Sequence, residues 1–192
     1  MSNRFLMVFA LGIASLCSVD AHAQTSWTID PAHSSINFEV RHMSVSNVHG
    51  SINGVKGTVI YNEQDIGKSS VQASADTVTV STGNEKRDTD LKSPSFFNVE
   101  KYPQLTFKST SLSNAGGKLT LTGDLTLNAI TKTVVLDVDG PAPPATDKNG
   151  KTRSGFSASG KLKRSDFNVG TKYPSAVIGD DIKFTIDLEI NK

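Results

Sequence analysis

Apolar residues recur at every second position over several stretches of this chain. The last stretch is the clearest, where five apolar residues alternate with polar ones: Ile182, Phe184, Ile186, Leu188 and Ile190. Strict alternation places apolar side chains on one face of an extended strand and polar side chains on the other. Because one dry face and one wet face are typical of antiparallel sheet, this pattern predicts an all-β protein.

The same alternation predicts further strands along the chain. It is present at 36–42, 104–109, 119–127 and 156–162, and strands also fit near 47–61, 69–81 and 132–139. Connectors such as Asn149-Gly150 favour the positive φ angles of hairpin turns. A total of about eight strands is the number at which a closed antiparallel β-barrel can hold one small ligand. A two-sheet sandwich would give much the same pattern, so the alternation favours the barrel only slightly.

A charged segment interrupts the strand pattern near residues 84–97. About two helical turns fit between Glu85 and Lys92, with Thr82-x-x-Glu85 as a candidate capping box and Asn84 as a competing N-cap. A helix this short is unstable alone in water, so apolar side chains must hold it. The apolar residues available for this contact are Leu91, Phe96 and Phe97. We therefore expect a short helical insertion that closes an open end of the barrel as a lid.

The N-terminus has the pattern of a secretory signal peptide. A positively charged start is followed by an apolar run of 13 residues that ends at Cys17, and Ala21-His22-Ala23 is a small-x-small cleavage pattern. The run is too short to cross a bilayer. We expect residues 1–23 to be removed and residues 24–192 to form a single domain. A lipoprotein anchored at Cys17 is the weaker alternative, because Leu16 stands where a small residue is usual.

The charge balance indicates no nucleic-acid partner. The chain has 20 basic and 19 acidic residues, and no basic cluster stands out.

Metal, cofactor and catalytic motifs are also missing from the sequence. The odd intervals between His33, His42 and His49 place no consecutive pair on one face of a continuous strand. There is no nucleophile elbow and no nucleotide-binding glycine motif. We expect no metal, no cofactor and no enzymatic activity.

Several motifs, in order, resemble the YceI-like family. They are Trp27-Thr28-Ile29-Asp30-Pro31-Ala32-His33-Ser34, Phe38-x-Val40-x-His42, Arg87-Asp88, Leu91-Lys92-Ser93, Phe96-Phe97, Tyr102-Pro103, Gly123-Asp124-Leu125-Thr126-Leu127 with Thr131-Lys132, and Arg164-x-Asp166-Phe167. Asp90 and Asn168 depart from the pattern, where His and Gly are more usual. The resemblance implies a lipocalin-like barrel in an exported, often periplasmic protein. It also implies an interior that binds an isoprenoid or another long-chain amphiphile, such as a fatty-acyl lipid.

The resemblance places the ligand site inside the barrel. The strand residues expected to line it are Phe38, Val40, Phe107, Leu121, Phe184 and Ile186, and the insertion would add Leu91, Phe96 and Phe97. A buried methylene contributes about 0.8 kcal/mol, so roughly two or three isoprene units would suffice for micromolar binding. The alternative for each residue is that it merely fills the core, because the interiors of small barrels are usually packed.

Two polar residues are candidates for contact with the head group of a ligand. His42 shares a strand face with Phe38 and Val40, so it either points at the ligand or closes the core with a hydrogen bond. Arg87, on the short helix, could bind a pyrophosphate or a carboxylate. Its alternative is structural, through a salt bridge or backbone carbonyls that hold the helix down.

Three classes of function fit these residues. The leading one is a periplasmic carrier that holds a lipid inside the barrel. The second is an enzyme that acts on such a lipid and depends on His42, Arg87 or Asp88. The third is an interaction protein with a filled barrel, for which the proline-rich residues 140–155 would form a contact loop. A homodimer and transient contact with a membrane are compatible with the leading hypothesis.

Overall fold

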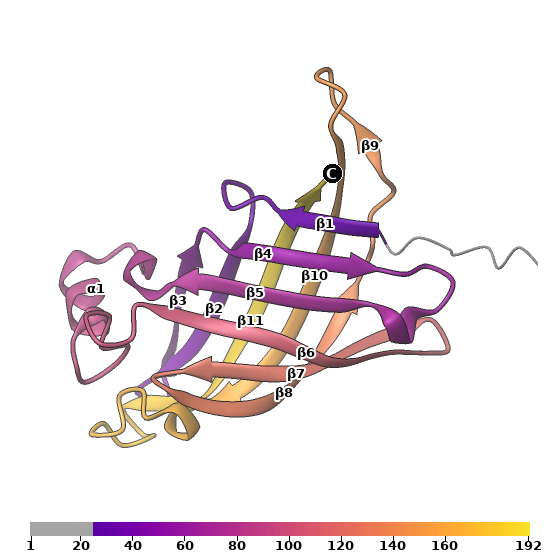
Figure 1. Ribbon diagram of the computed structural model, residues 1–192. Helices are drawn as coiled ribbons and strands as arrows, with labels where there is room; N and C mark the ends of the chain where they lie inside the picture. The colour runs from indigo at the N-terminus through magenta and orange to yellow at the C-terminus, as the bar shows by residue number, and fades with distance from the viewer. Residues whose placement is uncertain (1–24) are drawn as a thin grey trace, which may run out of the picture.

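The computed structural model describes residues 25–192, and antiparallel strands dominate it (Figure 1). The strands are β1 (Thr25–Ile29), β2 (Ser35–His42), β3 (Ser46–Asn53), β4 (Lys56–Tyr61), β5 (Ser70–Asp76), β6 (Gln104–Ala115), β7 (Lys118–Leu127), β8 (Ile130–Asp139), β9 (Ala145–Thr146), β10 (Thr152–Lys163) and β11 (Ile178–Asn191). The helix is α1 (Glu85–Lys92), and the short 3-10 helices are η1 (Ile66–Lys68), η2 (Thr77–Thr79) and η3 (Arg164–Phe167). The predicted signal peptide lies outside the described residues.

Eight strands close into a barrel. Hydrogen bonding runs in the order β11-β1-β4-β5-β6-β7-β8-β10 and returns to β11, and each neighbouring pair is antiparallel. The β10–β11 pairing that completes the ring extends from Arg153–Asn191 to Lys163–Asp181. This closure confirms the predicted all-β, lipocalin-like barrel and rules out the two-sheet sandwich.

Two of the barrel positions are each made by a pair of consecutive strands. β1 and β2 both pair with the same edge of β11, at Ile29–Ile190 and at Val40–Ile182 respectively. β3 and β4 are separated only by Gly54 and Val55, and Gly54 has a φ of 71°. The strand predicted near 47–61 is therefore two strands with a bend, at a position where glycine accepts positive φ.

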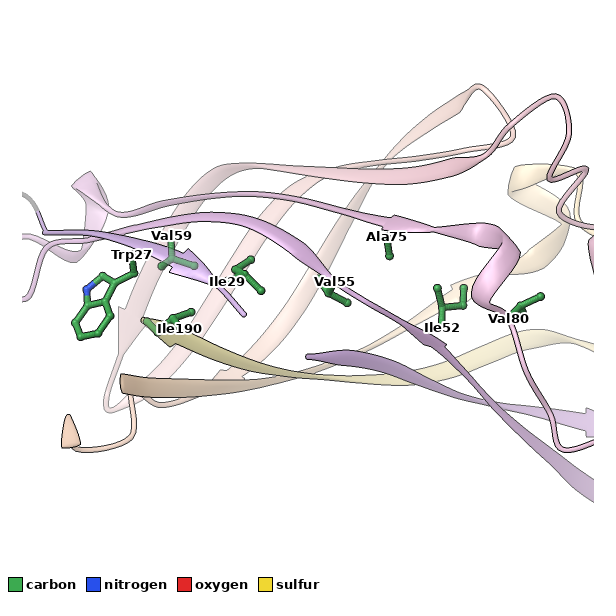
Figure 2. Close-up of a cluster of buried hydrophobic side chains, with 8 residues drawn as sticks. All are labelled: Trp27, Ile29, Ile52, Val55, Val59, Ala75, Val80 and Ile190. Atoms are coloured by element: carbon green, nitrogen blue, oxygen red, sulfur yellow. The ribbon is translucent and has the colours of Figure 1, made fainter. Parts of the chain in front are cut away.

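The buried apolar residues follow the inner wall of the barrel. The largest cluster takes its residues from β1, β3, β4, β5 and β11, from the bend between β3 and β4, and from the segment that follows η2: Trp27, Ile29, Ile52, Val55, Val59, Ala75, Val80 and Ile190 (Figure 2). A second cluster, Phe96, Leu127, Phe167 and Val169, joins the insertion to the η3 segment. A third, Leu121, Val134 and Leu136, lies on β7 and β8. Buried apolar residues therefore cover the inner face of the barrel sheet and close the end of the barrel at which the insertion lies.

The predicted helical insertion is confirmed, and α1 lies at one end of the barrel (Figure 1). Asn84 is its N-cap, because the Asn84 Oδ1 accepts a hydrogen bond from the Arg87 backbone N–H at 3.0 Å. The alternative capping box does not form. Instead, the Thr82 backbone N–H and hydroxyl donate to the Asp88 carboxylate at 2.8 and 2.5 Å. No helix within residues 25–192 is long and apolar enough to cross a membrane.

Candidate ligand-binding cavity

An apolar cavity of about 240 Å³ lies inside the barrel. Its lining extends from Phe96 and Val169, at the α1 end, to Tyr61 and Leu112, towards the other end. Almost no polar atom reaches the cavity surface. The volume lies somewhat below the roughly 300–1,000 Å³ typical of ligand pockets, but about 150 Å³ of apolar cavity suffices for benzene. The cavity therefore has the size and chemistry to hold part of a hydrocarbon chain.

Seven of the nine predicted site residues line this cavity: Phe38, Val40, Leu91, Phe96, Phe97, Phe107 and Phe184. Their role in binding a ligand stays a prediction. The rings on β2, β6 and β11 are only half-buried although they face inward, because one side of each ring borders the cavity. The two other tunnel residues expected from the alternation, Leu121 and Ile186, line it as well.

The alternation of apolar residues builds this lining. On β11, Phe184 and Ile186 face the cavity, whereas Asp187 lies outside and accepts a hydrogen bond from the Ser157 hydroxyl at 2.7 Å. The register aligns Phe38 of β2 with Phe184, so aromatic side chains of neighbouring strands form one row. Period two along each strand and the register between strands together produce a continuous apolar wall.

The insertion is fastened over the α1 end of the cavity. Asn128 Nδ2 donates to the backbone oxygens of Phe96 and Phe167 at 2.8 and 3.2 Å. The Gly170 backbone N–H donates to the Ser95 oxygen at 2.9 Å. Phe96 is 8% exposed and stacks on Tyr173, with 5.4 Å between ring centroids. These contacts join the insertion to the η3 segment as a hydrogen-bonded apolar plug.

Among the described residues that line the cavity, Arg164 alone is charged. It is 4% exposed, and all five of its N–H bonds donate to backbone oxygens. Nε binds Gly179 at 3.1 Å, Nη1 binds Val169 and Gly170 at 3.0 and 2.7 Å, and Nη2 binds Tyr173 and Ile178 at 2.8 Å each. The hydrogen bonds of Arg164 therefore hold the segment from η3 to the start of β11 in its conformation. The motif Arg164-x-Asp166-Phe167 is visible in the sequence, but it does not indicate that Arg164 binds backbone oxygens.

His42 does not occupy the inward position that strand alternation predicts. It is exposed at the end of β2 and does not line the cavity. The register of β2 against β11 shifts between Ile178 and Ile182, so the inward alternation ends at Val40. The inward position expected for His42 is therefore not found, because a bulge cannot be seen in the alternation of one strand. A contact between His42 and the head group of a ligand stays a prediction.

Arg87 is also absent from the cavity lining. Its Nε donates to the Thr82 hydroxyl oxygen at 2.7 Å, and its Nη2 donates to the Thr82 backbone oxygen at 3.2 Å. The same threonine donates to Asp88. This arrangement matches the structural alternative, in which Arg87 holds the helix down. This geometry gives no support for a contact between Arg87 and the head group of a ligand.

Tyr61 contributes a phenol towards the end of the cavity away from α1. Its ring meets Phe156 edge-on, with 5.9 Å between centroids, and both residues line the cavity. Burial raises the pKa of the Tyr61 hydroxyl, and the nearby Glu63 adds to this effect. The phenol is therefore neutral at physiological pH and is compatible with an apolar or neutral ligand group.

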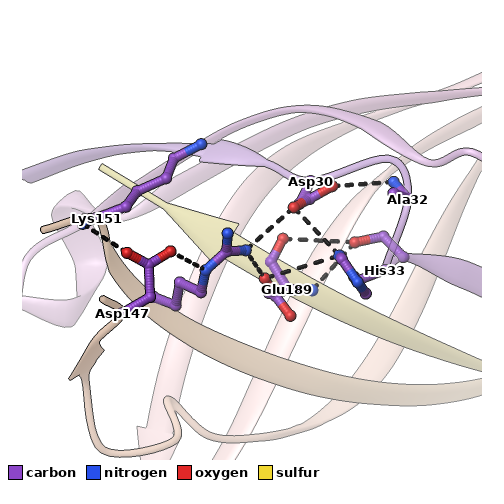
Figure 3. Close-up of polar contacts among 8 residues, drawn as sticks. Asp30, Ala32, His33, Asp147, Lys151 and Glu189 are labelled. Atoms are coloured by element: carbon purple, nitrogen blue, oxygen red, sulfur yellow. Dashed lines mark hydrogen bonds and ion pairs between the residues drawn. The ribbon is translucent and has the colours of Figure 1, made fainter. Parts of the chain in front are cut away.

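A charged cluster gathers around Glu189, near the C-terminal end of β11 (Figure 3). The ligand atoms of Asp30, His33 and Glu189 lie within 4.8 Å of one another, which is the spacing of a possible metal site. The Arg153 guanidinium already binds Glu189 and lies 3.2 Å from Asp30 and 3.1 Å from Asp147. The backbone N–H of Lys151 lowers the pKa of Asp147. Because Arg153 supplies the cation, this cluster is best explained as an ion-pair network.

Comparisons with known proteins agree with this architecture. The YceI-like domain family model matches residues 27–190. Protein YceI of Escherichia coli O157:H7 is 39% identical over 139 residues, which cover 72% of each chain. The crystal structure of the Campylobacter jejuni YCEI protein has a TM-score of 0.69 and 32% identity, covering 77% of this chain and 86% of that one.

A third comparison shows likeness of fold alone. The structure of a polyisoprenoid binding domain from Saccharophagus degradans, implicated in plant cell wall breakdown, has a TM-score of 0.63 at 14% identity. The match covers 85% of this chain and 97% of that domain. The family model spans nearly all of the described residues, and the relatives from E. coli and C. jejuni share about a third of their residues with this chain. This protein therefore belongs to the YceI-like family.

Proposed function

We propose that this protein binds the hydrocarbon chain of an isoprenoid or another long-chain amphiphile inside its barrel. The observation that carries the proposal is the cavity, whose surface is almost wholly apolar. The polyisoprenoid binding domain of Saccharophagus degradans supports it at the level of the fold. Fatty-acyl chains offer the same apolar surface and belong to the same ligand class.

The energetics of such binding come from the chain and not from the head group. Each methylene that enters the cavity contributes about 0.8 kcal/mol, and the lining offers a polar head almost nothing to bind. The one charged lining residue, Arg164, has every donor engaged with backbone oxygens. The head group would therefore remain at an end of the barrel, where water can solvate it.

The role proposed is that of a periplasmic carrier and not of an enzyme. The predicted signal peptide supports export, and an almost wholly apolar cavity suits holding a lipid more than transforming it. The residues that an acid–base mechanism would need, His42, Arg87 and Asp88, do not line the cavity. Arg87 and Asp88 both bind Thr82. A homodimer and transient contact with a membrane remain predictions.

The proposal is tested by placing a bulky side chain inside or outside the same strand. Ala158 of β10 lines the cavity, whereas the next residue, Ser159, is exposed on the outer face. Ala158→Phe should weaken binding of a fluorescent fatty acid by about tenfold or more, because the new ring displaces at least two methylenes. Ser159→Phe should bind as the unchanged protein does.

The measurement is a fluorescence titration of the three folded proteins, with circular dichroism as the check on folding. Farnesol and a saturated fatty acid serve as unlabelled competitors for the same site. Equal affinity of the Ala158 and Ser159 variants would place the fatty acid outside the barrel. No binding to the unchanged protein would contradict the proposal itself.

A further inference from the structure

Five glycines lie within strands at positions where the backbone does not need glycine, and three of them lie close to a phenylalanine ring. Gly50 is on β3, Gly123 on β7 and Gly160 on β10. None of them is among the residues with positive φ, in contrast to glycines of the turns such as Gly54. Glycine weakens the interior of a strand and often marks a close approach of another group. The presence of glycine at these three sites is therefore explained by the space that a side chain would need, and not by the backbone conformation.

A phenylalanine ring occupies the space that a side chain would need at each of them. A Cβ added to Gly50 would lie 2.3 Å from Cζ of Phe38, and one added to Gly123 would lie 2.3 Å from Cζ of Phe107. At Gly160, the Cβ would lie 2.8 Å from Cζ of Phe184. All three distances are shorter than real Cβ contacts, so no ring could keep its position above an alanine.

The strand register explains how the rings reach the glycines. Phe38 pairs with Gly50, Phe184 pairs with Gly160, and the two phenylalanines pair with each other. These residues form one row across β3, β2, β11 and β10, with a glycine at each end of the row. Each ring lies over the neighbouring strand, along the wall, and all three phenylalanines line the cavity. This covering of strand glycines by aromatic rings also compensates for their weak packing.

We propose that Gly50, Gly123 and Gly160 determine the width of the cavity, and thereby which hydrocarbon chains it admits. Each glycine gives a phenylalanine a place against the barrel wall. A side chain at the same position turns the ring into the cavity and narrows the space beside it. This proposal deepens the proposed function and rests on it, because the glycines act on the same lipid site without contacting the lipid through a side chain of their own.

Gly160 offers the cleanest test among the three. A Cβ at Gly50 would meet the Ser81 backbone oxygen at 2.8 Å, and a Cβ at Gly123 would meet the Lys108 backbone oxygen at 2.7 Å. Those substitutions would disturb the sheet itself. At Gly160, the nearest atoms all belong to the side chains of Phe184 and Leu136, which can move. Gly160→Ala therefore changes the position of the ring with little direct strain on the backbone.

The experiment compares four proteins: the unchanged chain, Gly160→Ala, Gly155→Ala and the double variant Gly160→Ala/Phe184→Leu. Gly155 is the matched control, because it lies on the same strand and its added Cβ would meet only the Leu188 backbone oxygen, at 3.0 Å. The double variant removes the ring that the alanine displaces. Affinities are measured for saturated fatty acids of increasing length and for farnesol, by competition with a fluorescent fatty acid.

Gly160→Ala should weaken binding of the longest chains by about tenfold, with a smaller effect on the shortest ones. Gly155→Ala should leave every affinity within about twofold, and the double variant should recover most of the loss. Equal affinities for Gly160→Ala and the unchanged protein would overturn the proposal while leaving the lipid site intact. A loss that the double variant does not recover would also overturn it.

A crystal structure of Gly160→Ala tests the proposal independently of any lipid. The Phe184 ring should leave the wall and enter the cavity. A ring that stays on the wall, with the strand shifted to admit the alanine, would contradict the proposal. If the unchanged protein binds none of the lipids, the proposed function fails, and the position of this ring still decides whether Gly160 sets the width of the cavity.

Discussion

At the scale of single residues, Arg164 shows how a buried charge can serve the fold. Its five N–H bonds end on five backbone oxygens of residues 169–179, which lead from η3 into the start of β11, and none of these partners is a carboxylate. The carbonyls of an irregular segment have no sheet partner, and leaving them unpaired when buried is costly. One guanidinium satisfies them together. The segment that carries Val169 into the apolar plug therefore depends on this side chain.

Arg164→Met should lower the free energy of unfolding by about 3 kcal/mol or more, because it leaves buried carbonyl groups without donors. The matched control is Lys163→Met, on the adjacent residue. Lys163 is 57% exposed and lies 3.3 Å from Asp181 at the surface, so its loss should cost less than about 1 kcal/mol. Urea unfolding of both variants measures the difference. Similar losses for the two variants would contradict the role assigned to Arg164.

The residue scale is also where prediction from sequence was least complete. The inward positions of Phe38 and Phe184 could be predicted, because each residue follows the alternation of apolar and polar residues in its own strand, and this alternation is visible in the sequence. His42 was misplaced because its position depends on a register shift in β11, which lies far away in the chain. The fit of rings over glycines depends on pairing between strands in the same way, so no local pattern could predict it.

At the scale of elements, the insertion is an example of local sequence and tertiary contact acting together. The Asn84 cap begins α1, and Thr82 connects the helix to the preceding segment through Asp88 and Arg87. The helix and its apolar contacts were predictable, because charged residues with a cap signal precede two phenylalanines. The bonds from Asn128 and Gly170 to the insertion were not, since they join segments that are distant in sequence.

The attachment of α1 should depend on pH through Asp88. The Thr82 hydroxyl and backbone N–H stabilise the Asp88 carboxylate and lower its pKa. A carboxyl group whose pKa is lower in the folded state stabilises the fold above its unfolded pKa of about 3.9. That stabilisation is lost as the pH falls through the lower, folded pKa. Asp88→Asn should therefore lower the Tm at neutral pH, and the difference from the unchanged protein should shrink in acid.

Thermal unfolding followed by circular dichroism at a series of pH values from neutral to strongly acidic measures this effect. The matched control is Asp90→Asn, an exposed position on the same helix, which should change the Tm little at neutral pH. A difference between Asp88→Asn and the unchanged protein that stays constant down to the most acidic pH would contradict the role of the ionised carboxylate.

At the scale of the whole molecule, closure turns a repeated strand pattern into a container. The alternation of apolar residues fits a sandwich as well as a barrel, because both have one dry face. The barrel forms, and not the sandwich, because β10 pairs with β11 and because β1 and β2 both pair with the other edge of β11. These are contacts between distant segments. The approximate number of barrel strands could be predicted from sequence, but β1 was not, and the closure of the barrel rested on the family resemblance.

The most direct test of the central claim is native mass spectrometry of the protein purified from a host that exports it, followed by extraction into organic solvent. The claim predicts a bound species of stoichiometric mass that extracts as a lipid, is clearly less abundant on Ala158→Phe, and is retained by Ser159→Phe. A protein that carries no extra mass, and that takes up neither added polyprenols nor added fatty acids, would contradict it.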